Sequence, residues 1–248
     1  MITIITTFAD RHYEEHAKYF LDGLKKYLDD DINVIIYTDT PYSFDSWQNY
    51  ILEDECPDLT QFKNRNGHRP IVEGKKGFIR DAVRFSHKSY CIVDAARKIK
   101  QGRMVWLDAD SEIISPLTSE YLTEKQDNNA FVSYLGRPNR YSETGFLSFN
   151  LDHKHSQAYF DRWQAYYDTD LIYHLGGQLD CHVFDAVTTE FVNSNKIKGQ
   201  SISPKDALKS HFDLAFQGVM CHYKGSKKEN VPALQERRNR KLKTSKQY

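Results

Sequence analysis

Two aspartates, Asp108 and Asp110, directly follow the short apolar run at residues 104–107, MVWL. That run is long enough for a buried strand. Residues two apart on a strand share a face, so we expect both carboxylates to point the same way. Open α/β sheets bind their ligands at the carboxyl ends of such strands. Two neighbouring carboxylates repel each other unless a cation lies between them, and a hard divalent cation that also binds phosphate oxygens suits this position.

An Asp-x-Asp motif has other interpretations. The two side chains could cap backbone amides in a solvated turn. Phosphatases and phosphotransferases of the haloacid-dehalogenase type also end a strand in Asp-x-Asp. Their motif resembles Asp-x-Asp-Gly-Thr and usually opens the domain, whereas here Ser111 and Glu112 follow and about a hundred residues precede.

A second stretch that could do chemistry lies at residues 219–228, VMCHYKGSKK, where a short apolar strand leads to His222. Imidazole suits a transition-type divalent metal such as Mn²⁺. Gly225 allows close approach of the backbone, and Lys228 supplies a point charge for phosphate. Taken alone, His222 is more typical of a structural histidine.

The flanking elements indicate an α/β fold. β-Branched runs predict strands at 2–8 and 32–37, and apolar residues at helical spacing predict a helix at 9–28. Strand, helix and strand form a parallel unit whose sheet is buried on both faces. We therefore expect one α/β domain over residues 1–230, with a mostly parallel central sheet flanked by helices.

Thr6, Thr7 and Asp39 end these two strands, at the sheet edge where Asp108 is expected. A nucleotide could bind there, although ordinary turn chemistry explains the same residues equally well.

Residues 41–76 predict a long polar loop, because Pro, Asn, Gly and charged residues dominate them. Helical spacing resumes at 76–99, where Arg80, Arg84 and Lys88 recur every four residues and share one stripe. Arg84 and Lys88 could reach a diphosphate or hold the Asp pair in place. A solvated helix face is the alternative.

Beyond the Asp pair, apolar runs predict strands at 130–134 and 145–149, joined by a polar loop, and a helix at 155–168. A Gly-Gly break then leads into another helix. Gln178 and Asp180 lie at its start, where helix geometry favours an acceptor oxygen or an anion. An N-cap is the alternative role for Asp180.

Together, VWLDAD and HYKGSKK resemble the motifs of GT-A-fold glycosyltransferases, most closely the retaining family-eight group that includes glycogenin and bacterial galactosyltransferases. In that group the Asp pair and the His bind Mn²⁺, while the Gly and Lys contact the donor's diphosphate. The resemblance implies metal ligands at Asp108, Asp110 and His222, diphosphate contacts at Gly225 and Lys228, and a UDP-sugar donor.

The rest of the chain matches the family's motifs less closely. Pro-Trp usually follows the Lys in the family, whereas Glu229 and Asn230 follow it here. Residues 143–145 (ETG) and 178–180 (QLD) match the family's Asn-Ala-Gly and Asp-Gln-Asp only loosely.

Cleavage of a sugar–diphosphate bond develops negative charge on the leaving group, which Mn²⁺ or Mg²⁺ and Lys228 would stabilise. Under retention, the leaving phosphate could take the acceptor proton, or a carboxylate could act as nucleophile. Glu143 and Asp180 are the candidate nucleophiles, and Gln178 completes the catalytic set that we predict. Inversion would require a general base instead.

Composition restricts the compartment and the partners. The formal net charge is zero, so no global field selects an acidic partner. The four dispersed cysteines fit reduced thiols better than a disulfide framework or a zinc knuckle. The N-terminus does not resemble a signal peptide, and no apolar run approaches the roughly 20 residues of a membrane span. We expect a cytoplasmic protein of a bacterial or phage-infected cell.

Residues 231–248 predict a basic tail, of which 235–248 contain six basic residues and one acid. Such a tail is usually a solvated end, but it could contact DNA or an anionic membrane. The acceptor could be a saccharide, a glycolipid, a protein, a small molecule, or hydroxylated bases in phage-type DNA, contacted by the basic residues at 63–76 and the tail together. A non-catalytic nucleotide-sugar-binding protein on the same fold is the rival class.

Overall fold

Apolar runs in the sequence form the centre of the fold, which we describe from a computed structural model covering residues 1–44, 46–69, 77–204 and 211–223. The strands are β1 (Ile2–Phe8), β2 (Ile32–Thr38), β3 (Gln48–Ile51), β4 (Arg103–Leu107), β5 (Ser111–Ile113), β6 (Val132–Arg137), β7 (Arg140–Asn150), β8 (Gly199–Ser201) and β9 (Met220–His222). The α-helices are α1 (Lys18–Tyr27), α2 (Leu52–Glu55), α3 (Pro57–Asn66), α4 (Ala82–Ile99), α5 (Ser119–Glu124), α6 (Ser156–Asp168), α7 (Asp180–Asn193) and α8 (His211–Ala215).

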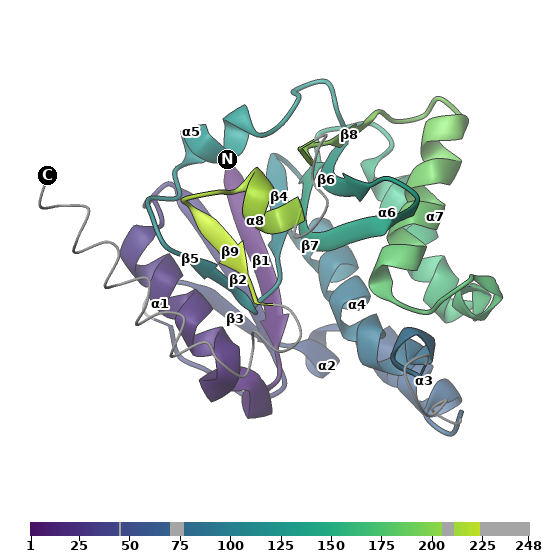
Figure 1. Cartoon of the computed structure of the whole chain (residues 1–248). Coiled ribbons are helices and arrows are strands. Elements are labelled where there is room, and N and C mark those ends of the chain that lie inside the picture. Colours follow the sequence, from purple (N-terminus) through teal and green to yellow (C-terminus); the bar gives the residue numbers. More distant parts are fainter. Residues whose placement is uncertain (45, 70–76, 205–210, 224–248) are drawn as a thin grey trace, which may run out of the picture.

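Seven of these strands form one sheet in the order β3-β2-β1-β4-β7-β6-β8 (Figure 1). β7 pairs antiparallel with β4 and β6, and the other pairs described in this sheet are parallel. β5 and β9 form a separate antiparallel ribbon. The predicted α/β fold with a mostly parallel central sheet is confirmed.

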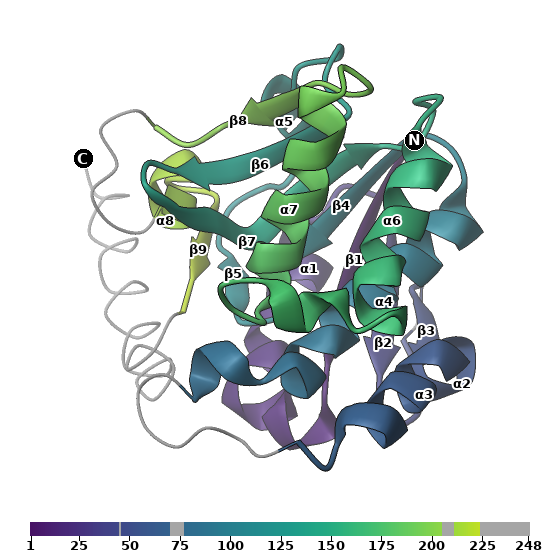
Figure 2. The same cartoon turned by 90° about the vertical axis from the view of Figure 1, so that its right-hand side faces the viewer.

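Alternate residues of β4 enter two different cores. Met104 and Trp106 pack in the core that α4, α6 and α7 share with the sheet, whereas Val105 and Leu107 pack in the core formed with α1 and the β5–β9 ribbon. Figure 2 shows α4, α6 and α7 in front of the sheet and α1 behind it. Because both faces are covered, β4 is apolar throughout its last four residues, as expected for a strand in a parallel sheet.

The loop predicted over residues 41–76 is wrong for much of its length, because β3, α2 and α3 lie within it. α3 begins with Pro57 at its first position and has Asp58 in its first turn, which are ordinary helix-start signals. Its buried side chains include Leu59 and Phe62. The remaining residues of α3 are mostly polar, and this composition concealed the helix. Residues 70–76 lie outside the described part of the chain.

The polar loop predicted between the strands at 130–134 and 145–149 is also wrong. β6 extends to Arg137 and β7 begins at Arg140, and these two residues pair across a two-residue turn. Pro138 and Asn139 form that turn, with Asn139 in the left-handed region at φ 57°. The Pro-Asn pair was a turn signal in the sequence.

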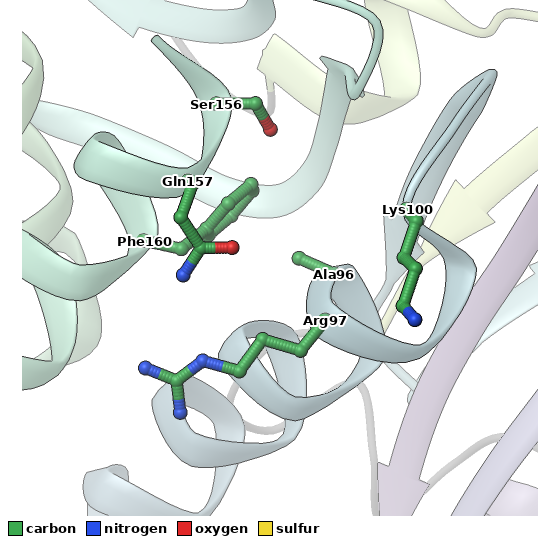
Figure 3. A pocket seen from close by; sticks show the side chains of 6 residues that line it. All are labelled: Ala96, Arg97, Lys100, Ser156, Gln157 and Phe160. Atoms are coloured by element: carbon green, nitrogen blue, oxygen red, sulfur yellow. The ribbon is translucent and has the colours of Figure 1, made fainter.

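A small hollow of about 160 Å³ lies between the last turns of α4 and the first turn of α6. Figure 3 shows Arg97 of α4 and Gln157 of α6 on opposite sides of it. Arg97 forms an ion pair with Asp161 at 2.9 Å. Since α4 ends there and β4 then begins, this hollow lies at the edge of the sheet opposite to Asp108.

Within the described ranges, no helix is both long and apolar enough to cross a bilayer. All four cysteines are free thiols.

We expect Gly23→Ala to destabilise the fold, although alanine favours a helix interior by about 1 kcal/mol over glycine. A Cβ atom at Gly23 would lie 2.7 Å from the carbonyl oxygen of Ile113, so α1 and β5 would have to separate. Overpacking of this kind costs about 1–3 kcal/mol, measurable by urea unfolding. Asp22→Ala, at an exposed neighbouring position on α1, is the control and should be neutral or stabilising. An equal effect of both substitutions would contradict the packing argument.

Candidate functional site

Asp108, Asp110 and His222 converge at the carboxyl end of β4. One ligand atom from each lies within 4.8 Å of the others. His222 Nε2 is 2.6 Å from an Asp110 oxygen and 3.7 Å from an Asp108 oxygen. Two carboxylates and an imidazole match the ligand preferences of Mn²⁺ and similar divalent ions. The residues present therefore fit the metal that the sequence motifs implied.

The two aspartates converge for a different reason from the one the sequence suggested. β4 ends at Leu107, so strand alternation does not continue through Asp110. A turn follows, in which the Ser111 amide donates to the Asp108 carbonyl at 2.9 Å. This turn, rather than a shared strand face, brings the two carboxylates together.

The β5–β9 ribbon brings His222 to the aspartates. Ser111 pairs with His222 in the ribbon, and the Tyr223 amide donates to the Asp110 carbonyl at 2.9 Å. The His222 amide is itself held by Asp213 of α8 at 2.8 Å. Backbone pairing thus fixes the histidine across 112 residues of sequence.

His222 is buried against β7. Its Nδ1 atom lies 3.5 Å from a Glu143 oxygen, on the opposite side of the ring from Asp110. Burial would lower the pKa of His222, but Asp110, Glu143 and Asp108 outweigh it and raise the pKa to about 9. A metal ion would take the place of that proton. A carboxylate on Nδ1 of a metal-binding histidine typically fixes the ring's orientation and tautomer.

Gly145 makes room for the imidazole. A Cβ atom there would lie 2.8 Å from His222 Cε1, 2.9 Å from Nδ1 and 3.4 Å from an Asp108 oxygen. With any residue other than glycine at position 145, the backbone of β7 could not approach His222 this closely. In the sequence, this glycine stood out only as part of residues 143–145 (ETG), which match the family's Asn-Ala-Gly loosely.

Lys88 of α4 lies between two carboxylates. Its ammonium group is 2.8 Å from Asp108 and 2.8 Å from Asp180, and it also donates to the Thr144 carbonyl at 2.6 Å. Burial would lower the pKa of Lys88, but the two aspartates raise it instead. Trp106 adds a second donor to Asp108 through its indole nitrogen, at 2.7 Å. Of the two roles considered for Lys88, these contacts describe holding in place for Asp108, the first member of the Asp pair, together with Asp180.

Asp180 is the first residue of α7, as predicted, but it is not an N-cap. Leu179 holds the cap position and makes no side-chain cap hydrogen bond. The Asp180 carboxylate instead accepts from Thr144 at 2.6 Å and contacts Lys88. Burial would raise the pKa of Asp180, but Lys88 and Thr144 lower it, so the group is ionised at neutral pH. Gln178 is also buried, and its backbone amide donates to the Ile79 carbonyl at 2.8 Å.

A large cavity of about 1010 Å³ opens at the same sheet edge, and Asp108, Asp110 and His222 are not among its lining residues. It is lined by the ends of β1 and β2, the start of α4, and parts of α2 and α3, and Thr7, Asp39 and Arg84 are among its lining residues. Thr6 is fully buried and donates its hydroxyl hydrogen to the Leu107 carbonyl at 2.7 Å, which ties β1 to β4. Asp108, Asp110 and His222 are called the Asp–His cluster below. Arg84 precedes Lys88 by one helical turn, so α4 contributes Arg84 to the cavity wall and Lys88 to the contacts of Asp108.

Two of the predicted diphosphate contacts, Gly225 and Lys228, lie outside the described residues, as does the basic tail at 231–248.

The sheet order, the helices on both faces and the Asp-x-Asp turn after β4 define the GT-A fold of glycosyltransferases. Among solved structures, the apo form of xyloside xylosyltransferase 1 from mouse matches 81% of this chain and 85% of its own, with a TM-score of 0.52 and 10% sequence identity. No protein-family model and no curated protein sequence matches the chain. At 10% identity this likeness establishes the fold.

We expect Lys88→Met to destabilise the protein by about 3–5 kcal/mol, because it leaves Asp108 and Asp180 without their shared cation. Mn²⁺ should recover part of this loss, since it neutralises Asp108. The measurement is urea unfolding with Mn²⁺ and with EDTA. Lys98→Met on the same helix removes a more exposed lysine from its pairs with Asp94 and Glu55, and it should cost at most about 1 kcal/mol. A loss no larger than that of Lys98→Met would refute the bridging role.

We expect Gly145→Ala to weaken Mn²⁺ binding although no metal ligand is changed. The added methyl group would meet the His222 ring and displace it from the aspartates. Titration calorimetry with Mn²⁺ should show at least a tenfold loss of affinity, comparable to the loss of a partner that orients a ligand. Gly218→Ala is not a suitable control, because Gly218 has φ 83° and alanine would strain the backbone there. Ser148→Ala is suitable, because Ser148 lies on β7 with Gly145. Equal affinity in Gly145→Ala and wild type would show that His222 is not a ligand.

Proposed function

We propose that this chain is a metal-dependent glycosyltransferase that moves a sugar from a nucleotide-sugar donor to an acceptor hydroxyl. The proposal rests mainly on one observation. In a GT-A fold, Asp108, Asp110 and His222 come together at the ligand-binding edge of the sheet, the same edge at which a cavity of about 1010 Å³ opens. Fold alone would not justify it, because one fold serves many functions.

The donor's nucleoside is assigned to the cavity, and its diphosphate to the Asp–His cluster. Thr7, Asp39 and Arg84 offer a hydroxyl, a carboxylate and a guanidinium along the cavity wall. Lys228 and Gly225 are assigned to the diphosphate through the family-eight resemblance, which also favours UDP and retention of configuration. The likeness to a xylosyltransferase supports sugar transfer as a class and does not select the sugar.

A divalent cation held by Asp108, Asp110 and His222 would stabilise the negative charge of the leaving diphosphate. The protein's own groups prepare that position. Lys88 and Trp106 both contact Asp108 and fix its carboxylate.

Two carboxylates are assigned separate roles. Asp180 is ionised and faces Lys88, so it suits a nucleophile or a stabiliser of positive charge on the sugar. Glu143 lies against His222 Nδ1, so we assign it to orienting the imidazole rather than to attack on the sugar. Gln178, which is buried two residues before α7 begins, is assigned to positioning the sugar.

We expect Asp110→Asn to abolish Mn²⁺-dependent donor binding while leaving the fold intact, because asparagine keeps the shape of the side chain but lacks the carboxylate charge that a divalent cation needs. The assay is nucleotide release from a panel of nucleotide sugars, with Mn²⁺ and then with EDTA, without acceptor. Hydrolysis of the preferred donor should fall by about 10²-fold or more. Donor binding is followed in parallel by calorimetry, so that a transferase that needs its acceptor is still detected.

Asp161→Asn provides the matched control, since Asp161 pairs with Arg97 at the opposite sheet edge. Its donor binding should equal that of wild type. Unchanged Mn²⁺-dependent donor affinity in Asp110→Asn would refute the proposed site. Release of inorganic phosphate from a phosphomonoester, lost in Asp108→Asn, would support a phosphatase instead. Donor binding without transfer to any acceptor would favour a binding protein.

A further inference from the structure

A second group of potential ligands lies on the wall of the large cavity, apart from the Asp–His cluster. His12, Glu15 and His16 each place one ligand atom within 4.8 Å of the other two. His12 Nδ1 is 3.0 Å from a Glu15 oxygen, and His16 Nδ1 is 3.9 Å from the same oxygen. The two imidazole rings are stacked with centroids 5.3 Å apart. All three residues line the cavity.

The local backbone explains the convergence. A 3₁₀ turn at Asp10–His12 leads into a π-helical turn at Tyr13–Ala17, and α1 then begins at Lys18. Side chains three and four residues apart lie on one side of such a helical segment. π-Helical turns are rare and are frequently found at functional sites. The same spacing is visible in the sequence as His12-x-x-Glu15-His16.

We propose that His12, Glu15 and His16 form a second metal site, for a borderline divalent cation of the Zn²⁺ or Co²⁺ class. This proposal is independent of the proposed function. Two imidazoles and one carboxylate are a common ligand set for Zn²⁺, and three protein ligands leave a fourth position open. That open position would face the cavity.

The ligand chemistry separates this site from the first one. The Asp–His cluster contains two carboxylates and one imidazole, with Glu143 next to the ring, and suits harder ions. The His12–Glu15–His16 group has the opposite ratio, and imidazole-rich sites favour Zn²⁺ and Co²⁺ over Mg²⁺ and Mn²⁺. One chain should therefore bind two ions of different preference.

The ligands must move modestly to hold an ion. Tetrahedral zinc with bonds of about 2.0–2.1 Å needs ligand atoms closer together than 4.8 Å, so side-chain rotation has to close the gap. His16 is largely buried, with 11% of its side chain exposed, and provides the fixed part of the site. His12 and Glu15 are more exposed, at 34% and 64%, and can turn toward it.

Arg11 competes with the ion. Its Nε donates to His12 Nε2 at 3.1 Å, which leaves the Nδ1 proton directed at Glu15. When His12 binds an ion through Nδ1, the ring proton moves to Nε2 and the contact with Arg11 is lost. Arg11 is exposed, so its guanidinium can turn into solvent at little cost. Removal of this cation should therefore strengthen metal binding.

The test is equilibrium dialysis of the full chain, stripped with EDTA, against Co²⁺, with visible cobalt absorption as a second readout. Wild type is expected to bind two Co²⁺ per chain. Glu15→Gln and His16→Gln should each weaken one of the two by at least about tenfold, as even the loss of an outer partner of a ligand does. Asp110→Asn should weaken the other one only. Arg11→Gln should bind the His12–Glu15–His16 ion several-fold more tightly.

Glu14→Gln is the matched control, because Glu14 is adjacent, exposed and paired with Lys18 outside the group. It should bind both ions as wild type does, and circular dichroism should show that every variant is folded. Wild-type Co²⁺ binding in both Glu15→Gln and His16→Gln would overturn the proposal. So would the loss of all bound Co²⁺ in Asp110→Asn. If only the Asp–His site does not bind metal, wild type should instead bind one Co²⁺, and Glu15→Gln should weaken that ion.

Discussion

A buried ammonium group shared by two carboxylates is the interaction on which the arrangement of this site depends. Lys88 reaches from α4 to Asp108 after β4 and to Asp180 at the start of α7. A buried lysine is costly unless opposite charges and hydrogen bonds compensate it, and here the Thr144 carbonyl completes the set. Consequently α4, the end of β4 and the start of α7 cannot move independently. These contacts tie three elements together at the carboxyl edge of the sheet, next to Asp108.

The rest of the Asp–His cluster depends on close backbone contact. The β5–β9 ribbon sets His222 opposite Ser111, and Gly145 leaves space for the imidazole between β7 and the aspartates. Glu143, two residues before Gly145 on β7, lies against Nδ1 of the His222 ring. Backbone pairing thus positions the ligand, and a carboxylate orients it. Such preorganisation is what a site needs if it is to stabilise charge that develops during a reaction.

The large cavity opens at the same sheet edge as this cluster, and the His12–Glu15–His16 group lines its wall. One part of its wall comes from the ends of β1 and β2, and another from the start of α4. Arginines and acidic residues both line it, so its field is mixed rather than uniformly positive, in agreement with the zero net charge of the chain. A ligand with both anionic and neutral polar parts fits such a lining better than a polyanion does. This distribution is the physical reason to favour a nucleotide over a nucleic acid in the cavity.

The sequence by itself determined the strands of the central sheet with apolar or β-branched runs, the helices with clear spacing, and the candidate set of Asp108, Asp110 and His222. These features follow from local periodicity and from ligand chemistry. Tertiary structure decided the rest. α3 was hidden because few of its residues are buried, and the turn after Leu107 replaced strand alternation because a hydrogen bond to the Asp108 carbonyl ends the strand. Asp180 became an ion-pair partner rather than a cap because α4 delivers Lys88 to it. Contacts of this kind join residues far apart in the chain, and no local pattern encodes the register that brings them together.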